Sequence, residues 1–312
     1  MPSYTGTIAE NFSLPLRLDR YVSERLGLLS RSQLKSRCIE AKVNGKLVKI
    51  SRLLKGGDWL ELNWSESEPL DLIPENLPLN ILYEDANVVL VNKEQGMVVH
   101  PGAGNRRGTL ANALLFRRLC LHGEHSSTNR SSQNLSSPES RLGIVHRLDK
   151  DTSGVIIAAY NNEALAFLAE QFKTRQVRKT YIAIVQGTPK ESSGTIETYI
   201  TRDPHDRKRF TVSTNKGKQA LTSYRVLRSW GAYSLVLLRP RTGRTHQLRV
   251  HLLHLGHPIL GDPIYGASTA RNVTLMLHAK SLRILLPGGT EPQTFRAPLP
   301  PRFGSYYESN CV

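Results

Sequence analysis

The 312-residue sequence predicts an α+β protein with a small N-terminal domain and a larger C-terminal domain. Short β-branched runs at 87–91 and 155–159 predict buried strands, and segments with apolar residues at helical spacing predict helices. An acidic, proline-rich stretch at 65–78 has the composition of a linker. A chain of this length has room for one large and one small domain, and we expect the larger one to cover 80–305.

The charge of the chain favours a polyanionic partner. It contains 42 lysines and arginines against 26 aspartates and glutamates, a formal net charge of +16, and such a surplus is typical of proteins that bind nucleic acid. The three cysteines, Cys38, Cys120 and Cys311, are too scattered for a zinc site or a disulfide framework. Because the sequence also lacks a leader-like start and an apolar run of transmembrane length, we expect a cytoplasmic protein without membrane or metal partners.

The N-terminal domain is predicted to begin with an arm at 1–13, whose first residues form either a short arm or an edge strand, and to continue with two short helices. Apolar residues recur at helical spacing over 18–26, which predicts the first helix. The capping-box pair Ser30 and Gln33 opens a second helix, expected to continue through Ile39.

A hairpin and a basic surface complete this domain. Asn44-Gly45 predicts a tight hairpin turn because both residue types accept positive φ angles, and a turn at 55–58 leads into an apolar strand at 59–64. Eleven lysines and arginines face only three carboxylates between 17 and 55. A solvated helix usually interleaves charges of both signs, so this surplus favours a surface that contacts phosphates.

The order helix, helix, hairpin resembles the small RNA-binding domain of ribosomal protein S-four over 14–75. The strings that carry the resemblance are Arg-Leu-Asp-Arg-Tyr-Val, Leu-Ser-Arg-Ser-Gln-Leu and Val-Asn-Gly-Lys. The resemblance implies RNA contacts by basic residues of this domain, for which we expect Arg31, Arg37, Lys42 and Lys46.

The stretch at 146–154 calls for a chemical explanation. It places three potential cations and two carboxylates in nine positions, between the apolar runs 142–145 and 155–159. Charges that border a core must be paired or hydrogen-bonded. By composition alone the stretch would be a solvated turn; its place before a buried strand favours a loop that carries chemistry.

The string Gly-Ile-Val-His-Arg-Leu-Asp-Lys-Asp-Thr-Ser-Gly at 143–154 closely resembles the signature of the RluA-type pseudouridine synthases. With the S-four-like domain ahead of it, the chain resembles the RluD-like members of that family. The resemblance implies a mixed, largely antiparallel central sheet with flanking helices. It also implies that Asp149 is catalytic and that Arg147 fills the place of the extruded uridine, whereas we expect His146 to orient the loop.

One further segment differs from the family motif, and another is expected to be an insertion. At 92–102 the family usually has Asn-Lys-Pro, and here Glu94 replaces the proline, which questions the rigidity of the turn more than catalysis. We expect His100, in the same segment, to line the site without reacting. The serine-rich stretch 121–140 is polar and aperiodic, and predicts a surface insertion.

The run 180–187 predicts a strand that carries a site residue. Tyr181 by itself would most often be a core aromatic residue. The resemblance implies instead that Tyr181 stacks on the target base. Before this strand, Asn162 is expected to cap a helix; after it, 203–218 is expected to form an exposed excursion over the site.

The string from Arg241 to Gly266 matches a third family motif. Thr245 is expected to cap a helix that ends at Gly256. The resemblance implies that Arg249 pairs with the catalytic aspartate, and Arg244 and His246 in the same string are expected to bind substrate.

The reaction that the resemblance implies makes sense of these residues. Pseudouridine formation breaks the bond from ribose to N1 of uracil, rotates the base and rejoins the ribose to carbon 5, so it needs no redox cofactor and no metal. It needs one ionised carboxylate in a closed pocket. Arg249 would keep Asp149 charged, since a planar guanidinium suits bidentate pairing with a carboxylate. Whether Asp149 attacks the ribose or removes its 2′ proton is left open by the sequence.

The sequence therefore predicts an RNA pseudouridine synthase, an isomerase, that acts on structured RNA, most plausibly large-subunit ribosomal RNA; transfer RNA is the alternative substrate. Two other functions compete with this prediction. One is a non-catalytic RNA-binding factor in ribosome assembly. The other is a glycosidic hydrolase, which would ordinarily need a second carboxylate, and Asp151 lies too close in sequence to Asp149 to be assigned that role.

Overall fold

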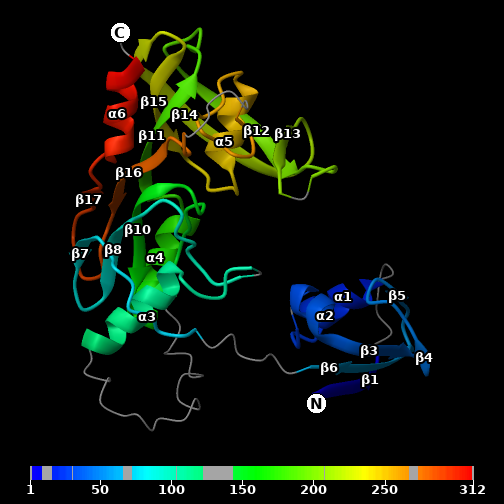
Figure 1. Cartoon of the computed structure of the whole chain (residues 1–312). Helices are drawn as coiled ribbons and strands as arrows, with labels where there is room; N and C mark the ends of the chain where they lie inside the picture. The colour runs from blue at the N-terminus through cyan, green and yellow to red at the C-terminus, as the bar shows by residue number, and fades with distance from the viewer. Residues whose placement is uncertain are drawn as a thin grey trace. The chain divides into compact units, whose positions relative to one another are not determined.

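The computed structural model describes residues 2–8, 16–29, 31–65, 72–102, 104–121, 143–206, 208–266 and 273–310. The chain divides into two compact units, Met1–Asp71 and Leu72–Val312 (Figure 1). The predicted insertion at 121–140 lies outside the described residues except for Leu121, which ends a helix. No helix in the described ranges is long and apolar enough to cross a membrane.

The first unit packs short helices against a four-stranded sheet. The sheet has the order β1-β6-β3-β4, and β2 pairs with β5 beside it. The helices pack on the sheet around a core that includes Leu18, Leu34, Leu60 and Leu62. The elements are β1 (Ser3–Thr7), β2 (Leu16–Arg17), α1 (Leu18–Arg20), the π-helical turn η1 (Tyr21–Arg25), α2 (Arg31–Arg37), β3 (Cys38–Val43), β4 (Lys46–Leu47), β5 (Leu53–Leu54) and β6 (Trp59–Trp64).

Most predicted elements of this unit are present, with one difference. The second helix ends at Arg37, because Cys38 already pairs with Trp64 in the sheet, so the prediction of helix through Ile39 was wrong. Of the two alternatives for the N-terminal residues, arm or edge strand, residues 3–7 form the edge strand, along β6. The hairpin turn is confirmed, with φ angles of 54° at Asn44 and 75° at Gly45.

The second unit is built on an 11-stranded sheet with the order β13-β12-β14-β15-β11-β16-β10-β8-β7; β17 pairs with β16 and β9 with β10. All pairings are antiparallel except β10 with β16. The expected mixed, largely antiparallel sheet with flanking helices is thus confirmed.

The strands of this sheet are β7 (Ile81–Glu84), β8 (Val88–Lys93), β9 (Gly143–Ile144), β10 (Ser153–Ala159), β11 (Arg178–Gln186), β12 (Ser193–Arg202), β13 (Phe210–Ser213), β14 (Lys218–Trp230), β15 (Tyr233–Pro240), β16 (Leu277–Ile284) and β17 (Gln293–Arg296). The helices are α3 (Leu110–Leu121), α4 (Asn162–Lys173), α5 (Gln247–His254) and α6 (Pro301–Asn310). The predicted excursion at 203–218 is partly wrong, since β13 within it adds a strand to the sheet edge.

Strand β10 is buried along its whole length, since all seven of its residues are buried. On one face Val155 and Ile157 pack in the cluster that contains Leu168 of α4. On the other face Ile156 packs in the cluster that contains Leu114 of α3. Burial on both faces explains why the strand reads as a continuous apolar run. The charged segment at 146–152 leads directly into this strand.

Asn161, not Asn162, caps helix α4. The Asn161 side chain accepts a hydrogen bond from the Ala164 amide at 2.8 Å, while the backbone of Asn161 is extended. The cap and the start of the helix therefore lie one residue earlier than predicted.

Gly154 allows β10 to approach β16 closely. Its φ is +114°, and a Cβ at this position would lie 2.2 Å from the Ala279 carbonyl oxygen. Only glycine fits both the backbone conformation and the space. This contact holds the start of β10, and with it the charged loop that precedes β10, against β16. Strand β16 also pairs with β11.

Replacing Gly154 with alanine should destabilise the unit by about 3 kcal/mol or more, because strain at positive φ adds to a clash with backbone atoms. Gly231→Ala is the matched control: its φ is +48°, and nothing lies within 4 Å of the added Cβ, so about 1 kcal/mol is expected. Urea unfolding of both variants checks the difference. Equal losses would mean that the β10–β16 contact is not tight.

Two buried histidines should make the unit sensitive to acid. Burial lowers the pKa of His251 and of His278 to about 4, from an ordinary value of 6.5. Between these values the unfolded chain binds a proton that the folded chain does not, so stability falls as the pH drops from 6.5 towards 4. Each histidine contributes about 1.4 kcal/mol per pH unit. Urea unfolding at pH 7, 6 and 5 should show a smaller loss for His251→Gln and His278→Gln; slopes identical to the unaltered protein would contradict this.

Candidate active site

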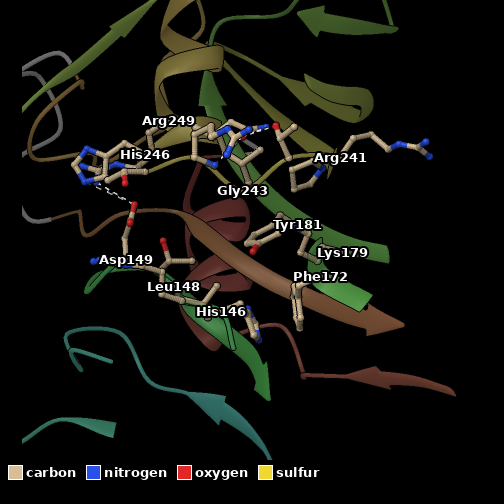
Figure 2. Close-up of a pocket in the computed structure, with 18 of the residues that line it drawn as sticks. His146, Leu148, Asp149, Phe172, Lys179, Tyr181, Arg241, Gly243, His246 and Arg249 are labelled. Carbon is tan, nitrogen blue, oxygen red and sulfur yellow. Dashed lines mark hydrogen bonds and ion pairs between the residues drawn. The ribbon is translucent and has the colours of Figure 1, made fainter. Parts of the chain in front are cut away.

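A cavity of about 620 Å³ lies in the second unit (Figure 2). Three segments form most of its lining: the loop between β9 and β10, the end of α4 with the start of β11, and the segment from β15 into α5. The cavity brings together the residues that the sequence predicted for the site of this unit, and His100 also lines it. They are His146, Arg147, Asp149, Tyr181, Arg244, His246 and Arg249.

Asp149 faces the cavity from the loop that feeds β10. Its Oδ2 accepts a hydrogen bond from Nη1 of Arg249 at 3.4 Å, and Nε2 of His246 lies 3.9 Å from the same oxygen. The side chain of Asp149 keeps 19% of its surface exposed. The Thr152 amide closes a turn on the Asp149 carbonyl at 3.1 Å, which holds the loop in shape. The carboxylate is therefore fixed and still open to a substrate.

Arg249 is held chiefly by Asp262, which the sequence analysis missed. Nε and Nη2 of Arg249 donate to the two carboxylate oxygens of Asp262 at 2.7 Å each. The expected bidentate pairing of Arg249 with Asp149 was wrong in this respect: Asp149 receives a single, longer bond. Asp262 is fully buried and also accepts from the amides of Ile264 and Tyr265.

The Asp262 pairing keeps Arg249 charged inside the protein. Burial by itself lowers the pKa of Arg249, but the hydrogen bonds and charge of Asp262, with a smaller contribution from Asp149, raise it above its ordinary value. The Tyr265 ring lies under the guanidinium, 5.1 Å from its carbon. A signal for Asp262 was present in the sequence, since an aspartate stands between the apolar residues Leu260 and Ile264.

His246 occupies the N-cap position of α5, where Thr245 was expected. Its φ is 56°, a left-handed conformation, and its side chain does not cap the helix. The Thr245 prediction was therefore wrong. Nδ1 of His246 and the Tyr265 hydroxyl are 2.9 Å apart, which explains how this backbone is held. Burial lowers the pKa of His246, with the charge of Asp149 acting in the opposite direction, so the ring is neutral at pH 7.

Tyr181 lies on β11 between Asp149 and Lys179 (Figure 2). The pairing of β11 with β16 shifts register between Thr180 and Tyr181, where Lys280 of β16 is the extra residue. Burial and the charge of Asp149 raise the pKa of Tyr181, so its hydroxyl stays protonated. Tyr181 lines the cavity.

His146 is fixed by its surroundings and is not available for proton transfer. Its Nε2 accepts a hydrogen bond from the Ile157 amide at 3.1 Å, and its ring stacks on Phe172 with centroids 4.6 Å apart. Burial, with a smaller effect from Lys179, lowers the pKa of His146 to about 3. These contacts fit the expected orienting role. Arg147, the next residue, is exposed at the cavity, and Arg244 donates to the Gln219 carbonyl at 3.0 Å.

The buried Lys93, which was not predicted from the sequence as a site residue, holds the loop that carries Asp149 in place. It is 1% exposed, and its ammonium donates to the carbonyls of Glu94, Met97 and Lys150 at 2.8, 2.9 and 3.0 Å. Burial lowers the pKa of Lys93 to about 8. The Glu94 carbonyl is thus anchored where the family has a proline. The sequence feature that could have indicated this role is a lysine two residues after the apolar run 88–91.

The four residues of the first unit that were predicted to bind RNA differ from one another in their surroundings. Arg31 pairs with Asp19 at 3.1 Å and Lys42 with Glu40 at 3.0 Å. Lys46 is exposed, and the side chain of Arg37 lies outside the described residues. Their contact with RNA stays a prediction.

The chemistry that the cavity supports follows from its charges. Asp149 is the only acidic residue among those that line it, and the described part of the chain holds no group of three or more histidines, cysteines or acids that could bind a metal. Asp262 is turned towards Arg249 and fully buried. A hydrolase with two working carboxylates does not fit this arrangement. With one positioned carboxylate beside an aromatic ring, the cavity is suited to a reaction on a single bound nucleoside.

Comparison with known proteins agrees with this geometry. Residues 87–254 match the family model described as RNA pseudouridylate synthase. The chain is 44% identical to the ribosomal large subunit pseudouridine synthase D of Borreliella burgdorferi, over 97% of this chain and 93% of that protein. It is 43% identical to an uncharacterized RNA pseudouridine synthase of Chlorobaculum parvum, over 92% and 91%.

Solved structures give the same result. The human RNA pseudouridylate synthase domain containing 4 superposes with a TM-score of 0.58 at 31% identity, covering 73% of this chain and 92% of that one. The human RNA pseudouridylate synthase domain containing 1 gives a TM-score of 0.56 at 30% identity, over 75% and 86%. The chain therefore belongs to the RNA pseudouridylate synthase family and is an RNA pseudouridine synthase, an isomerase.

Proposed function

We propose that this enzyme converts specific uridines of large-subunit ribosomal RNA to pseudouridine, with Asp149 as its catalytic carboxylate. The observation that carries the proposal is that Asp149 is the one acidic residue among the described residues that line the cavity, and that Arg249 holds it there. The substrate rests on relatives named large subunit pseudouridine synthase D, at 44% and 39% identity. A cytoplasmic location, expected from the sequence, belongs to the same proposal.

In this proposal the target uridine leaves its stack and enters the cavity between Asp149 and Tyr181. Leaving the stack costs a few kcal/mol, and the exposed Arg147 is placed to fill the gap in the RNA. Tyr181 offers a ring face to the uracil, and its protonated hydroxyl adds no charge. Asp149 then acts on the ribose, by attack or by proton removal, while the uracil rotates and rejoins through carbon 5. Neutral His146 and His246 shape the site without exchanging protons.

Asp149→Asn should reduce tritium release from RNA labelled at carbon 5 of uridine by about 10³-fold or more, since the asparagine amide is neither a base nor a nucleophile. Asp151→Asn, two residues away in the same loop, is the matched control and should retain activity within about threefold, because Asp151 does not line the cavity. Both variants should unfold at the temperature of the unaltered enzyme to within about 4 °C.

The same assay decides the substrate and the role of Asp149. Release from unmodified large-subunit RNA but not from transfer RNA supports the proposal. Release only from transfer RNA overturns the substrate and keeps the chemistry. Tight binding of both RNAs without release favours the non-catalytic assembly factor, and equal losses for the two aspartate variants would contradict the role of Asp149.

Asp262→Asn should lower kcat more than it raises KM. The asparagine keeps an oxygen for the Ile264 and Tyr265 amides, but Arg249 loses its charged partner and its fixed orientation towards Asp149. We expect about 10- to 100-fold in kcat and about 3 kcal/mol of stability, the usual range when one partner of a buried ion pair is removed. Single-turnover kinetics with urea unfolding measure both. An unchanged kcat would mean that Asp262 has no part in positioning Arg249.

A further inference from the structure

Lys179 lines the cavity and has no role in the chemistry described above. It lies on β11 two residues before Tyr181. Its ammonium has no hydrogen-bond or ion-pair partner in the part of the chain that the structure describes, and burial alone lowers its pKa. Lys179 as a whole is only partly buried, and its ammonium stays accessible from the cavity. An unpaired cation that faces a cavity is a candidate contact for an anion.

The surroundings of Lys179 favour an anion further. Lys173, Arg175 and Arg241 line the same cavity. Figure 2 shows Lys179 and Phe172 on the side of Tyr181 away from Asp149, while the exposed side chain of Arg241 extends away from them. Gly243 leaves room beside the ammonium, since a Cβ there would already lie within 3.6 Å of the lysine Nζ. This end of the cavity is therefore cationic and open.

We propose that Lys179 forms a subsite that binds a phosphodiester of the RNA strand next to the target uridine. The inference rests on the proposed function, because it takes the uracil to lie against Tyr181. Residues two apart on a strand share a face and are separated by about 7 Å, so a phosphate flanking that nucleoside lies within reach of the lysine. Phosphate contacts fix the register of a nucleic acid strand, and this one would deliver the uridine to Asp149.

A competing explanation is that Lys179 serves only to keep His146 neutral. The lysine charge does lower the pKa of His146, but burial is the larger cause. His146 would therefore still accept its hydrogen bond from Ile157 without the lysine. A lysine whose only task was structural would also be expected to have a hydrogen-bond acceptor, as Lys93 has three.

The test compares Lys179→Met with Lys190→Met, an exposed lysine outside the cavity. In tritium-release assays on large-subunit RNA, Lys179→Met should raise KM about tenfold or more, as expected for a lost charged hydrogen bond, with a smaller change in kcat. Its dependence of log(kcat/KM) on log salt should be shallower by about one contact. Its melting temperature should stay level, because the substitution removes no hydrogen bond or ion pair within the part of the chain that the structure describes. Lys179→Arg should recover most of the affinity, and Lys190→Met should match the unaltered enzyme.

A neutral methylphosphonate placed in turn at each phosphate flanking the mapped uridine, in a synthetic RNA, identifies the contact. The unaltered enzyme should lose affinity at one of these positions, and Lys179→Met should lose nothing further there. Independent losses at every position, an unchanged KM and salt slope, or a fall in kcat alone would overturn the subsite while the enzyme's activity stands. If only transfer RNA is modified, the substrate proposal fails and the comparison is made on that RNA; loss of melting temperature in Lys179→Met with no change in salt slope would instead establish a structural lysine.

Discussion

The buried pairing of Arg249 with Asp262 is the interaction on which the site depends. It neutralises a guanidinium that would otherwise be costly to bury, and it fixes the geometry from which that guanidinium reaches Asp149 at 3.4 Å. Both oxygens of Asp262 are used on Arg249, and Oδ1 also receives backbone amides. Asp149 is thereby left with only two long contacts on Oδ2, from Arg249 and His246, and with 19% of its side chain exposed to the cavity.

The fold supports this arrangement by joining distant segments at one place in the sheet. Strand β10 is buried on both faces and pairs with β16 through the close approach at Gly154. The loop before β10 carries Asp149, and Lys93 ties that loop to the segment after β8. Strand β11, on the other side of β16, carries Tyr181 and Lys179. The side chains that line the cavity are thus carried by a strand or by a loop that is tied to strands. Such rigid support positions the side chains of a site precisely.

The sequence predicted the elements and residues whose signals are local. The Asn44-Gly45 turn, strand β6, strand β10 and the residues that line the cavity could be read from turn chemistry, apolar patterns and motif strings. Helix α3 was missed because its residues are apolar nearly all round. Asp262 and Lys93 were missed because their partners are set by tertiary contacts far along the chain, and the same holds for the left-handed His246, which long-range contacts with Tyr265 and Asp149 hold in place. The end of α2 was misplaced because sheet pairing of Cys38 overrides its helical spacing.

In the proposed reaction one carboxylate, held by Arg249, isomerises a uridine without releasing its base. The most direct test is a nucleoside balance: large-subunit RNA is incubated with the enzyme, digested, and its uridine, pseudouridine and free uracil are measured. The account predicts that pseudouridine appears in the amount that uridine disappears, with no free uracil. Free uracil in place of pseudouridine would show that the cavity hydrolyses the glycosidic bond, and would contradict the account.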